Sequence, residues 1–428
     1  MKNFYLSLII ALSSFLTFSQ NDFTNGGGDF LWSNSANWTL GRVPISTDVT
    51  RVETVSGSKV DANFTIFRLQ NTFGTAINTS VGGGGTGTIT IDPGAGGAAI
   101  QNVSSNGVEL SFTGKVEINN PPADNSIMNM ANNAGNSIVF ADGSTLTLTT
   151  NLQVNSGSNS TFNFNGSLAG SGALRLSGAT TSIFGSTSNN SGFAGDIVYI
   201  GSATVIVNSA DDNVFLPSGR KLQINANNGS VQVNGANVFD GNITVGGANT
   251  FNVDMNKNQD NMGTLVFSVN GTLNFDVDAS VTHLSFANNA SSPWNTGKLN
   301  ITGFKNKTIR FGTDATGLTA QQLAQITADG NTGLTLDAFG YLEDPSLSNN
   351  DFKSLKFQLY PNPVTDIVNI NSAEPLSKVE VINVLGKTVK VFTQNLESVN
   401  ISNLPKGMYL LSLETQDQKT ALKKIIKK

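Results

Sequence analysis

One short pattern recurs along most of this chain of 428 residues and constrains its fold more than any other feature. Two or three apolar residues stand at every second position, and a turn rich in glycine, asparagine and serine follows. This alternation places apolar side chains on one side of a β-strand and polar side chains on the other. Strands this short, with turns this frequent, predict an all-β fold. The pattern occupies residues 30–341, for example at 88–91, 116–118, 146–148, 162–164, 174–176, 231–233, 273–277 and 299–301.

The turns leave two architectures open, a β-solenoid and a multi-stranded β-sandwich. Asn-Gly and Gly-Asn pairs recur at 165–166, 234–235, 241–242 and 270–271. These residues accept positive φ, which solenoid corners and tight hairpins both need. The chain has no cysteine, so its stability cannot come from disulfides. A solenoid can do without them, because its stacked turns, or rungs, bury one continuous core.

Two segments resemble the glycine-spaced repeats of autotransporter-type passenger domains. They are residues 168–178 (LAGSGALRLSG) and 235–245 (GANVFDGNITV). Residues 32–38 (WSNSANW), followed by residues 41–44 (GRVP), are similar to the opening segment of such proteins. The resemblance implies a right-handed parallel β-helix. At about 20–30 residues per rung, it would contain on the order of a dozen rungs.

Both ends of this region carry residues suited to closing a stack of rungs. Residues 318–326 (LTAQQLAQI) predict a short helix, because Thr319 can cap it and Gln322 stands at the capping-box position. This segment resembles the closing segment of bacterial solenoid passengers. A terminal helix would cover the last rung and block edge-to-edge aggregation. Trp32 and Trp38 are expected to cap the first rung.

The N-terminal segment predicts export from the cytoplasm. Lys2 supplies a positive charge, and residues 4–18 are apolar apart from serine and threonine. About fifteen such residues are typical of a signal peptide and too few for a comfortable membrane span. Small residues precede the expected cleavage site between Ser19 and Gln20. We therefore expect a signal peptide at 1–19 and a mature protein that begins at Gln20.

The last part of the chain predicts a second, smaller β domain. Pro361 and Pro363 make its start stiff, since each fixes φ and restricts the residue before it. Short alternating segments follow, with turns near Gly386 and Gly407. About seven short strands at this spacing predict a small β-sandwich. The strand segments include 366–370, 378–381, 388–391, 400–402, 408–413 and 419–426.

This domain resembles the type A C-terminal sorting domain of proteins exported by the type IX secretion system of certain Gram-negative bacteria. The resemblance implies an Ig-like sandwich that the outer-membrane translocon recognises. A sortase usually removes this sandwich, and the passenger is then released or attached to surface lipopolysaccharide. An ordinary Ig-like adhesive module is the alternative. The matching residues are Tyr360, Pro361, Asn362, Pro363, Asp366, Gly386, Lys387, Gly407 and Tyr409, followed by the lysine-rich end.

Charge divides between the two regions. Residues 21–350 hold 13 Lys+Arg and 23 Asp+Glu, a net of −10, whereas residues 352–428 hold 11 Lys+Arg and 6 Asp+Glu, a net of +5. Nucleic-acid binding needs a basic face, and none is visible in the larger region. The basic C-terminal region fits either an acidic partner during export or a solvated tail. The expected organisation is a signal peptide at 1–19, a β-solenoid passenger at 20–342, a linker at 343–355 and a sorting domain at 356–428.

The sequence contains little evidence of a nucleotide-binding or metal-binding site. Gly82, Gly84 and Gly87 fit the spacing of a dinucleotide-binding loop, but a predicted strand follows them where that loop needs a helix. His283 is the only histidine and is expected on the solvent side of a strand. One histidine and no cysteine exclude multi-histidine metal sites and cysteine nucleophiles. We predict no cofactor, no metal site and no catalytic residue.

Paired carboxylates are the best indication of an enzyme. Asp276 and Asp278 would share the outer face of one strand, and Asp211 and Asp212 are adjacent. The β-helix lyases and hydrolases that cleave polysaccharides use surface carboxylates together with basic residues. Because no basic residue lies near Asp276 in the sequence, the simpler interpretation is that these aspartates keep the surface soluble.

The sequence therefore favours a secreted or cell-surface structural, adhesin-like protein exported by the type IX secretion system. Polar faces on a repetitive rod suit weak, repeated contacts with surfaces or glycans. The alternative is a β-helix polysaccharide lyase or glycoside hydrolase acting on an extracellular glycan, since fold alone does not fix function. The expected partners are the type IX translocon and a sortase, with surface lipopolysaccharide or glycans as further candidates and no nucleic acid.

Overall fold

The computed structural model describes residues 18–346 and 357–428, with gaps at 53–54, 72–77, 95–96, 105–106, 120–125, 131–134, 157–159, 179–180, 226–228, 248–249, 373 and 417–419. The chain forms two compact units, one ending at Asp344 and the other beginning at Pro345. Most of the expected signal peptide, residues 1–17, lies outside the described residues. No helix among the described residues is long and apolar enough to cross a membrane.

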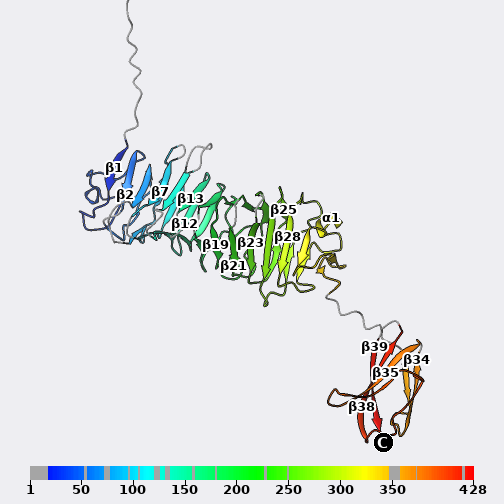
Figure 1. The fold of residues 1–428 in the computed structure, drawn as a ribbon. Coiled ribbons are helices and arrows are strands. Elements are labelled where there is room, and N and C mark those ends of the chain that lie inside the picture. The colour runs from blue at the N-terminus through cyan, green and yellow to red at the C-terminus, as the bar shows by residue number, and fades with distance from the viewer. Residues whose placement is uncertain are drawn as a thin grey trace, which may run out of the picture. The chain divides into compact units, whose positions relative to one another are not determined.

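The first unit is built on two long parallel sheets of 11 strands each (Figure 1). The first long sheet contains, in spatial order, β1 (Ser19–Asp22), β2 (Asp48–Arg51), β4 (Arg68–Asn71), β7 (Ala98–Asn102), β10 (Ser126–Met130), β13 (Leu152–Ser156), β16 (Leu174–Gly178), β18 (Ile197–Tyr199), β20 (Lys221–Ile224), β22 (Asn242–Val245) and β25 (Leu265–Phe267). The second long sheet contains β5 (Thr79–Val81), β8 (Glu109–Phe112), β11 (Ser137–Phe140), β14 (Thr161–Phe164), β17 (Thr181–Phe184), β19 (Thr204–Val207), β21 (Ser230–Val233), β23 (Thr250–Met255), β26 (Thr272–Val277), β28 (Lys298–Thr302) and β30 (Ile326–Ala328).

Shorter sheets form a third side, and a small hairpin completes the unit. The third side contains β3 (Phe64–Ile66), β6 (Thr88–Ile91), β9 (Lys115–Ile118), β12 (Thr145–Leu148) and β15 (Ser167–Gly170), and further along β24 (Gln259–Met262), β27 (Leu284–Phe286) and β29 (Ile309–Phe311). The hairpin pairs β31 (Thr335–Leu336) with β32 (Leu342–Glu343).

Strand partners in the two long sheets lie one rung apart in the sequence. The separation ranges from 19 residues, between Val49 and Arg68, to 31 residues, between Leu69 and Ile100. All of these pairings are parallel, so the chain rises by one strand with each turn. The unit is therefore a parallel β-solenoid of about 11 turns, which confirms the solenoid over the sandwich for this region.

The apolar half of the alternation faces the interior of the solenoid. Leu146, Phe164, Leu174, Val233 and Phe275 are each at most 1% exposed and belong to one continuous core. Like side chains stack on successive rungs, because equivalent positions lie directly above one another. The aromatic series Phe112, Phe140, Phe164, Phe184 and Phe215 has successive ring centroids 4.8 to 5.7 Å apart.

The glycine-rich run near residue 85 serves this stacking. A side chain at Gly87 would collide with the backbone of Ala62 on the rung below, and one at Gly85 would collide with Val60. The run leads into strand β6, as expected. Close approach of two rungs therefore explains glycines whose spacing is similar to that of a phosphate-binding loop.

Both ends of the solenoid carry the elements predicted there. At the start, Trp38 packs edge-on against Trp32 and Phe23, and its Nε1 donates to the Trp32 carbonyl over 2.8 Å. A short 3₁₀ helix η1 (Ser35–Asn37) lies between the two tryptophans. At the other end, helix α1 (Ala320–Leu323) begins with a capping box between Thr319 and Gln322. This helix is one turn long, because Ile326 already belongs to strand β30.

The second unit is an antiparallel β-sandwich, as predicted. Its seven strands form a three-stranded and a four-stranded sheet around a separate core that includes Val368, Val381 and Leu411. The three-stranded sheet contains β33 (Phe357–Tyr360), β34 (Ile367–Ser372) and β37 (Ser398–Asn400). The four-stranded sheet contains, in spatial order, β36 (Thr388–Phe392), β35 (Leu376–Asn383), β38 (Gly407–Thr415) and β39 (Thr420–Lys427).

Candidate functional site

The side chain of Asn362 joins the two ends of the C-terminal unit. Its Nδ2 donates to the Lys424 carbonyl over 3.0 Å, and its Oδ1 accepts from the Ile426 backbone N–H over 3.0 Å. Next to it, Val364 exchanges backbone hydrogen bonds of 2.8 Å with Ile426 and Lys428. The segment after β33 thus runs beside the last strand, although more than sixty residues separate them. We call this end of the sandwich, where Asn362 and Val364 contact residues 424–428, the latch end.

The other residues of the tyrosine-proline motif surround Asn362. Tyr360 ends strand β33 and is 53% exposed, and both proline bonds, Tyr360–Pro361 and Asn362–Pro363, are cis. Asp366 precedes strand β34, and its carbonyl accepts from the Ile401 N–H over 2.7 Å. The side chain of Asp366 is exposed.

A hairpin tip presents Gly386 and Lys387 at the latch end. The side-chain oxygen of Asn383 accepts from the backbone N–H groups of Leu385 and Lys387 over 3.0 Å each, which holds the turn. Gly386 has φ of +77°, a left-handed conformation that glycine adopts without strain. Lys387 is exposed, so its ammonium group faces solvent.

Gly407 and Tyr409 begin strand β38 beside the end of the chain. Gly407 pairs with Lys427, Tyr409 pairs with Ile425 on one side, and Asn383 pairs with Tyr409 on the other. Tyr409 is 7% exposed, and its hydroxyl donates to the Pro405 carbonyl over 2.9 Å. Such a bond from a tyrosine to upstream backbone fixes a corner in Ig-like sandwiches. Strand register therefore brings the predicted residues of four separate segments to one end of the sandwich.

Residues 358–428 match the sequence model of a family described as the secretion system C-terminal sorting domain. The chain carries a type IX sorting domain. No curated protein matches the chain, and no solved structure matches it. The sorting domain directs the protein through the type IX secretion system to the cell surface or the medium. The latch end thus belongs to the part of the chain that the secretion machinery handles.

The latch end of the sorting domain also exposes apolar side chains that the sequence analysis missed. Val384 and Leu385 on the hairpin tip are 67% and 87% exposed, and Met408 and Ile426 lie side by side on strands β38 and β39 at 47% and 41%. Exposed apolar clusters of this kind mark protein–protein contact sites. The signal for them was available, since Met408 and Ile426 fall out of phase with the buried positions of their strands.

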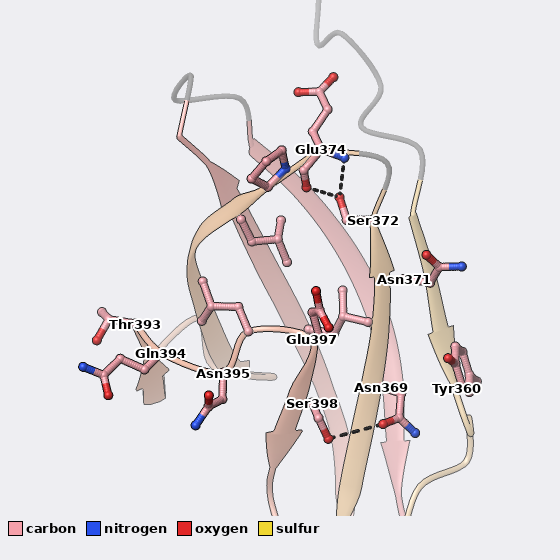
Figure 2. A pocket seen from close by; sticks show the side chains of 14 residues that line it. Tyr360, Asn369, Asn371, Ser372, Glu374, Thr393, Gln394, Asn395, Glu397 and Ser398 are labelled. Atoms are coloured by element: carbon pink, nitrogen blue, oxygen red, sulfur yellow. Dashed lines mark hydrogen bonds between the residues drawn. The ribbon is translucent and has the colours of Figure 1, made fainter.

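A polar cavity of about 1100 Å³ lies in the sorting domain along the three-stranded sheet. Figure 2 shows Thr393, Gln394 and Asn395 of the loop after β36 on one side of the view and Asn371 and Tyr360 on the other. The hydroxyl of Ser398 donates to the Asn369 side-chain oxygen over 3.3 Å at the lower edge of this view. Strands β33 and β34 and the segments 374–376 and 393–398 together line this cavity, which is why local sequence patterns did not indicate it.

Ser19 and Gln20, the residues of the expected cleavage site, begin strand β1 of the solenoid. The hydroxyl of Ser19 donates to Asp48, whose carboxylate also binds Arg42 through two bonds of 2.6 and 2.8 Å. Burial acts to raise the pKa of Asp48, but the hydrogen bonds from Arg42 and Ser19 outweigh it and hold the pKa below its usual value. This ion pair fixes the first rung.

The aspartate pairs considered as enzyme candidates have structural partners. Asp276 faces outward on β26 and accepts from the Thr302 hydroxyl over 2.9 Å. Asp278 lies after that strand, and hydrogen bonds from the side chain and backbone of Ser280 lower its pKa. Asp211 accepts from the Ala236 N–H over 2.9 Å on the next rung.

His283 lies just before strand β27 with 37% of its side chain exposed, and its Nε2 is 2.6 Å from Asp260. Its exposure agrees with the expected solvent-facing position. In the part of the chain that the structure describes, no three histidine, aspartate or glutamate side chains gather in a way that could hold a metal ion.

The second long sheet carries a regular polar column on its outer surface. Nine successive strands place a hydroxyl or amide side chain at the matching position, and none of these residues is charged. The column consists of Ser137, Thr161, Thr181, Thr204, Ser230, Asn252, Asn274, Asn300 and Thr327. The spacing of strands in a sheet repeats these groups about every 4.8 Å.

Proposed function

We propose that the solenoid is an adhesive rod that acts outside the cell, and that the sorting domain brings it there. The polar column of the second long sheet supports this proposal most directly. One outward position keeps the same kind of uncharged hydrogen-bonding group over nine rungs. Many weak, equivalent contacts to a repetitive surface add to a strong one when they are held on one scaffold.

The same proposal covers the handling of the chain during export. We expect cleavage of the signal peptide between Ser19 and Gln20, and a sortase that separates the passenger from the sorting domain within or near the linker. Glu343 and Asp344 belong to the solenoid, where Glu343 forms part of β32 and Asp344 is 1% exposed. The passenger is then either released or attached to surface lipopolysaccharide.

An enzyme acting on an extracellular glycan is the second candidate, and one observation favours it. Asp254 and Asp276 stand side by side on adjacent rungs. Burial, and then the charge of Asp276, raise the pKa of Asp254. Glycosidases use two carboxyl groups, one as the acid and one as the base or nucleophile. Both groups stand on the open outer surface of a sheet.

Incubation of the purified protein with neutral and acidic polysaccharides, with and without Ca²⁺, separates the two candidates. The adhesive rod predicts that the protein sediments with at least one insoluble polysaccharide and releases no oligosaccharide. Release of oligosaccharides would establish the enzyme instead. Loss of that release in an Asp254→Asn variant would assign the cleavage to the carboxylate pair.

A further inference from the structure

Asn252, Asn274, Asn300 and Thr327, which we call the amide ladder, form a chain of hydrogen bonds along the outside of the second long sheet. Asn274 donates to the Oδ1 of Asn252 over 2.9 Å, and Asn300 donates to the Oδ1 of Asn274 over 3.1 Å. The hydroxyl of Thr327 donates to Asn300 over 2.8 Å. The side chains of the ladder are therefore ordered before any ligand arrives.

Each middle amide keeps hydrogen-bonding capacity that the ladder does not use. A primary amide has two N–H donors and an oxygen with two lone pairs. Asn274 gives one N–H to Asn252 and one lone pair to Asn300, so one donor and one acceptor remain. Asn252 is exposed, and Asn274 and Asn300 are half-buried on the outward side of their strands. A fixed donor and a fixed acceptor are thus offered to solvent at Asn274 and at Asn300. Binding through them would cost little side-chain entropy.

The columns on either side of the ladder limit the kind of ligand. Asp254 and Asp276 lie two positions after ladder residues on their strands. Thr272 and Lys298 lie two positions before ladder residues, on the other side of the ladder. An acidic polymer would meet two carboxylates, and a basic polymer would meet an ammonium group. The outward side chains on the two sides of the ladder are Thr250, Thr272 and Lys298, and Asp254, Asp276 and Thr302, so this part of the sheet lacks the apolar centre of a protein interface.

We propose that the amide ladder binds an extended, uncharged polysaccharide that lies along the axis of the solenoid. Its groups repeat at the strand spacing of about 4.8 Å, which is close to the length of one sugar ring in an extended chain. Each ring would then meet one rung, and its hydroxyl groups can both donate to and accept from the free groups of an amide. This inference rests on the proposed adhesive function and names its ligand and its surface.

The test compares binding of the full chain to cellulose and chitin, which are neutral, and to alginate and pectate, which are acidic. The ladder variant carries Asn274→Val and Asn300→Val, because valine suits a strand and forms no side-chain hydrogen bonds. The matched control carries Gln223→Val and Thr244→Val, two outward positions on adjacent rungs of the first long sheet. We expect the ladder variant to lose about tenfold in retention on a neutral polysaccharide and the control to lose none.

A second variant, Asn274→Leu, guards against misfolding of the double variant, because it keeps the size of the side chain and removes the donor to Asn252 without adding a charge beside Asp254 and Asp276. It should also reduce retention on the neutral polysaccharide while its melting temperature stays near that of the parent chain. Unchanged retention in both ladder variants, or preferential retention on alginate or pectate, would overturn the ladder assignment and leave the adhesive rod standing. Retention on none of the four polysaccharides would overturn the ladder assignment and also count against the adhesive function.

Discussion

The solenoid and the sorting domain solve the same problem of burying β-strands in opposite ways. The solenoid stacks parallel strands and builds an interior that runs through all its rungs. The sorting domain pairs antiparallel strands and closes a small core between two sheets. Their surfaces differ as well. Nine of the thirteen exposed large apolar side chains among the described residues belong to the sorting domain, which makes it the part suited to recognition by another protein.

We propose that this difference divides function along the chain. The solenoid presents repeated polar groups at a fixed spacing, which the proposed adhesive function would use for many weak contacts outside the cell. The sorting domain interacts with the secretion machinery, and we propose that its latch end, with exposed apolar and lysine side chains, is the surface that this machinery contacts. If the two units are as independent as their separate cores indicate, a change in one should leave the stability of the other unaltered.

A cavity in the solenoid core would test this independence with the largest effect. Phe164 packs between Phe140 and Phe184 at centroid distances of 5.6 and 5.7 Å. We expect Phe164→Ala to reduce the free energy of unfolding of the solenoid by about 4 kcal/mol, from lost burial and the cavity left behind. Chemical denaturation should show that the transition of the sorting domain does not move. The matched outward change Thr181→Ala should cost less than about 0.5 kcal/mol, and a comparable loss there would contradict the assignment of faces.

Removal of the buried carboxylate at the first rung should have the next largest effect. Asp48→Asn breaks the paired bonds to Arg42 and should cost the solenoid about 2 kcal/mol, because bonds to charged groups are among the stronger ones. The pKa of Asp48 is lowered in the folded protein, so its contribution is present above the ordinary aspartate pKa and is lost as pH falls through the lower folded value. Thermal melts of the parent and variant should converge at acid pH. A constant difference across pH would contradict the ion-pair explanation.

Loss of the Asn362 side chain should affect only the sorting domain. Asn362→Ala removes two hydrogen bonds to the backbone of strand β39 and should cost about 1 kcal/mol, because both bonds lie near solvent. Hydrogen exchange should become faster at the Ile426 amide and stay the same in the solenoid. Protection at Ile426 equal to that of the parent chain would show that the latch does not hold the last strand.

The smallest expected effect is a gain in stability. Asp254 and Asp276 are like charges on adjacent rungs, and burial together with Asp276 raises the pKa of Asp254. A raised carboxyl pKa means that folding is favoured below the ordinary pKa and penalised once pH rises through the folded value. Asp254→Asn should therefore stabilise the solenoid by about 0.5 kcal/mol at neutral pH and not at acid pH. Thermal melts at both pH values measure this, and destabilisation at neutral pH would contradict it.

The sequence predicts the fold well because alternation is a local property. Leu146, Leu174 and Val233 could be assigned to the interior from their own strands, and the capping box of Thr319 and Gln322 from four consecutive residues. Turn chemistry alone could not separate a solenoid from a sandwich, and the resemblance to known passengers was needed for that choice.

The candidate sites were less predictable because they depend on register between distant strands. Nothing near Asn362 indicates that its amide reaches strand β39, and nothing near Asn252 indicates that Asn274 lies beside it. The number of residues between successive rungs varies from 19 to 31, so the sequence does not show which outward side chains become neighbours. The columns could be read only once the pairing of the strands was known.

The assignment of export to the sorting domain and of adhesion to the solenoid is tested most directly with two forms of the protein, the full chain and a chain that ends at Asp344. Cells that express each form are fractionated, and each form is then tested for retention on an insoluble neutral polysaccharide. We predict that the full chain reaches the surface or the medium, and that the shortened chain remains in the periplasm yet is retained on the polysaccharide equally well. Surface delivery of the shortened chain, or loss of its retention, would contradict the assignment of export to one unit and adhesion to the other.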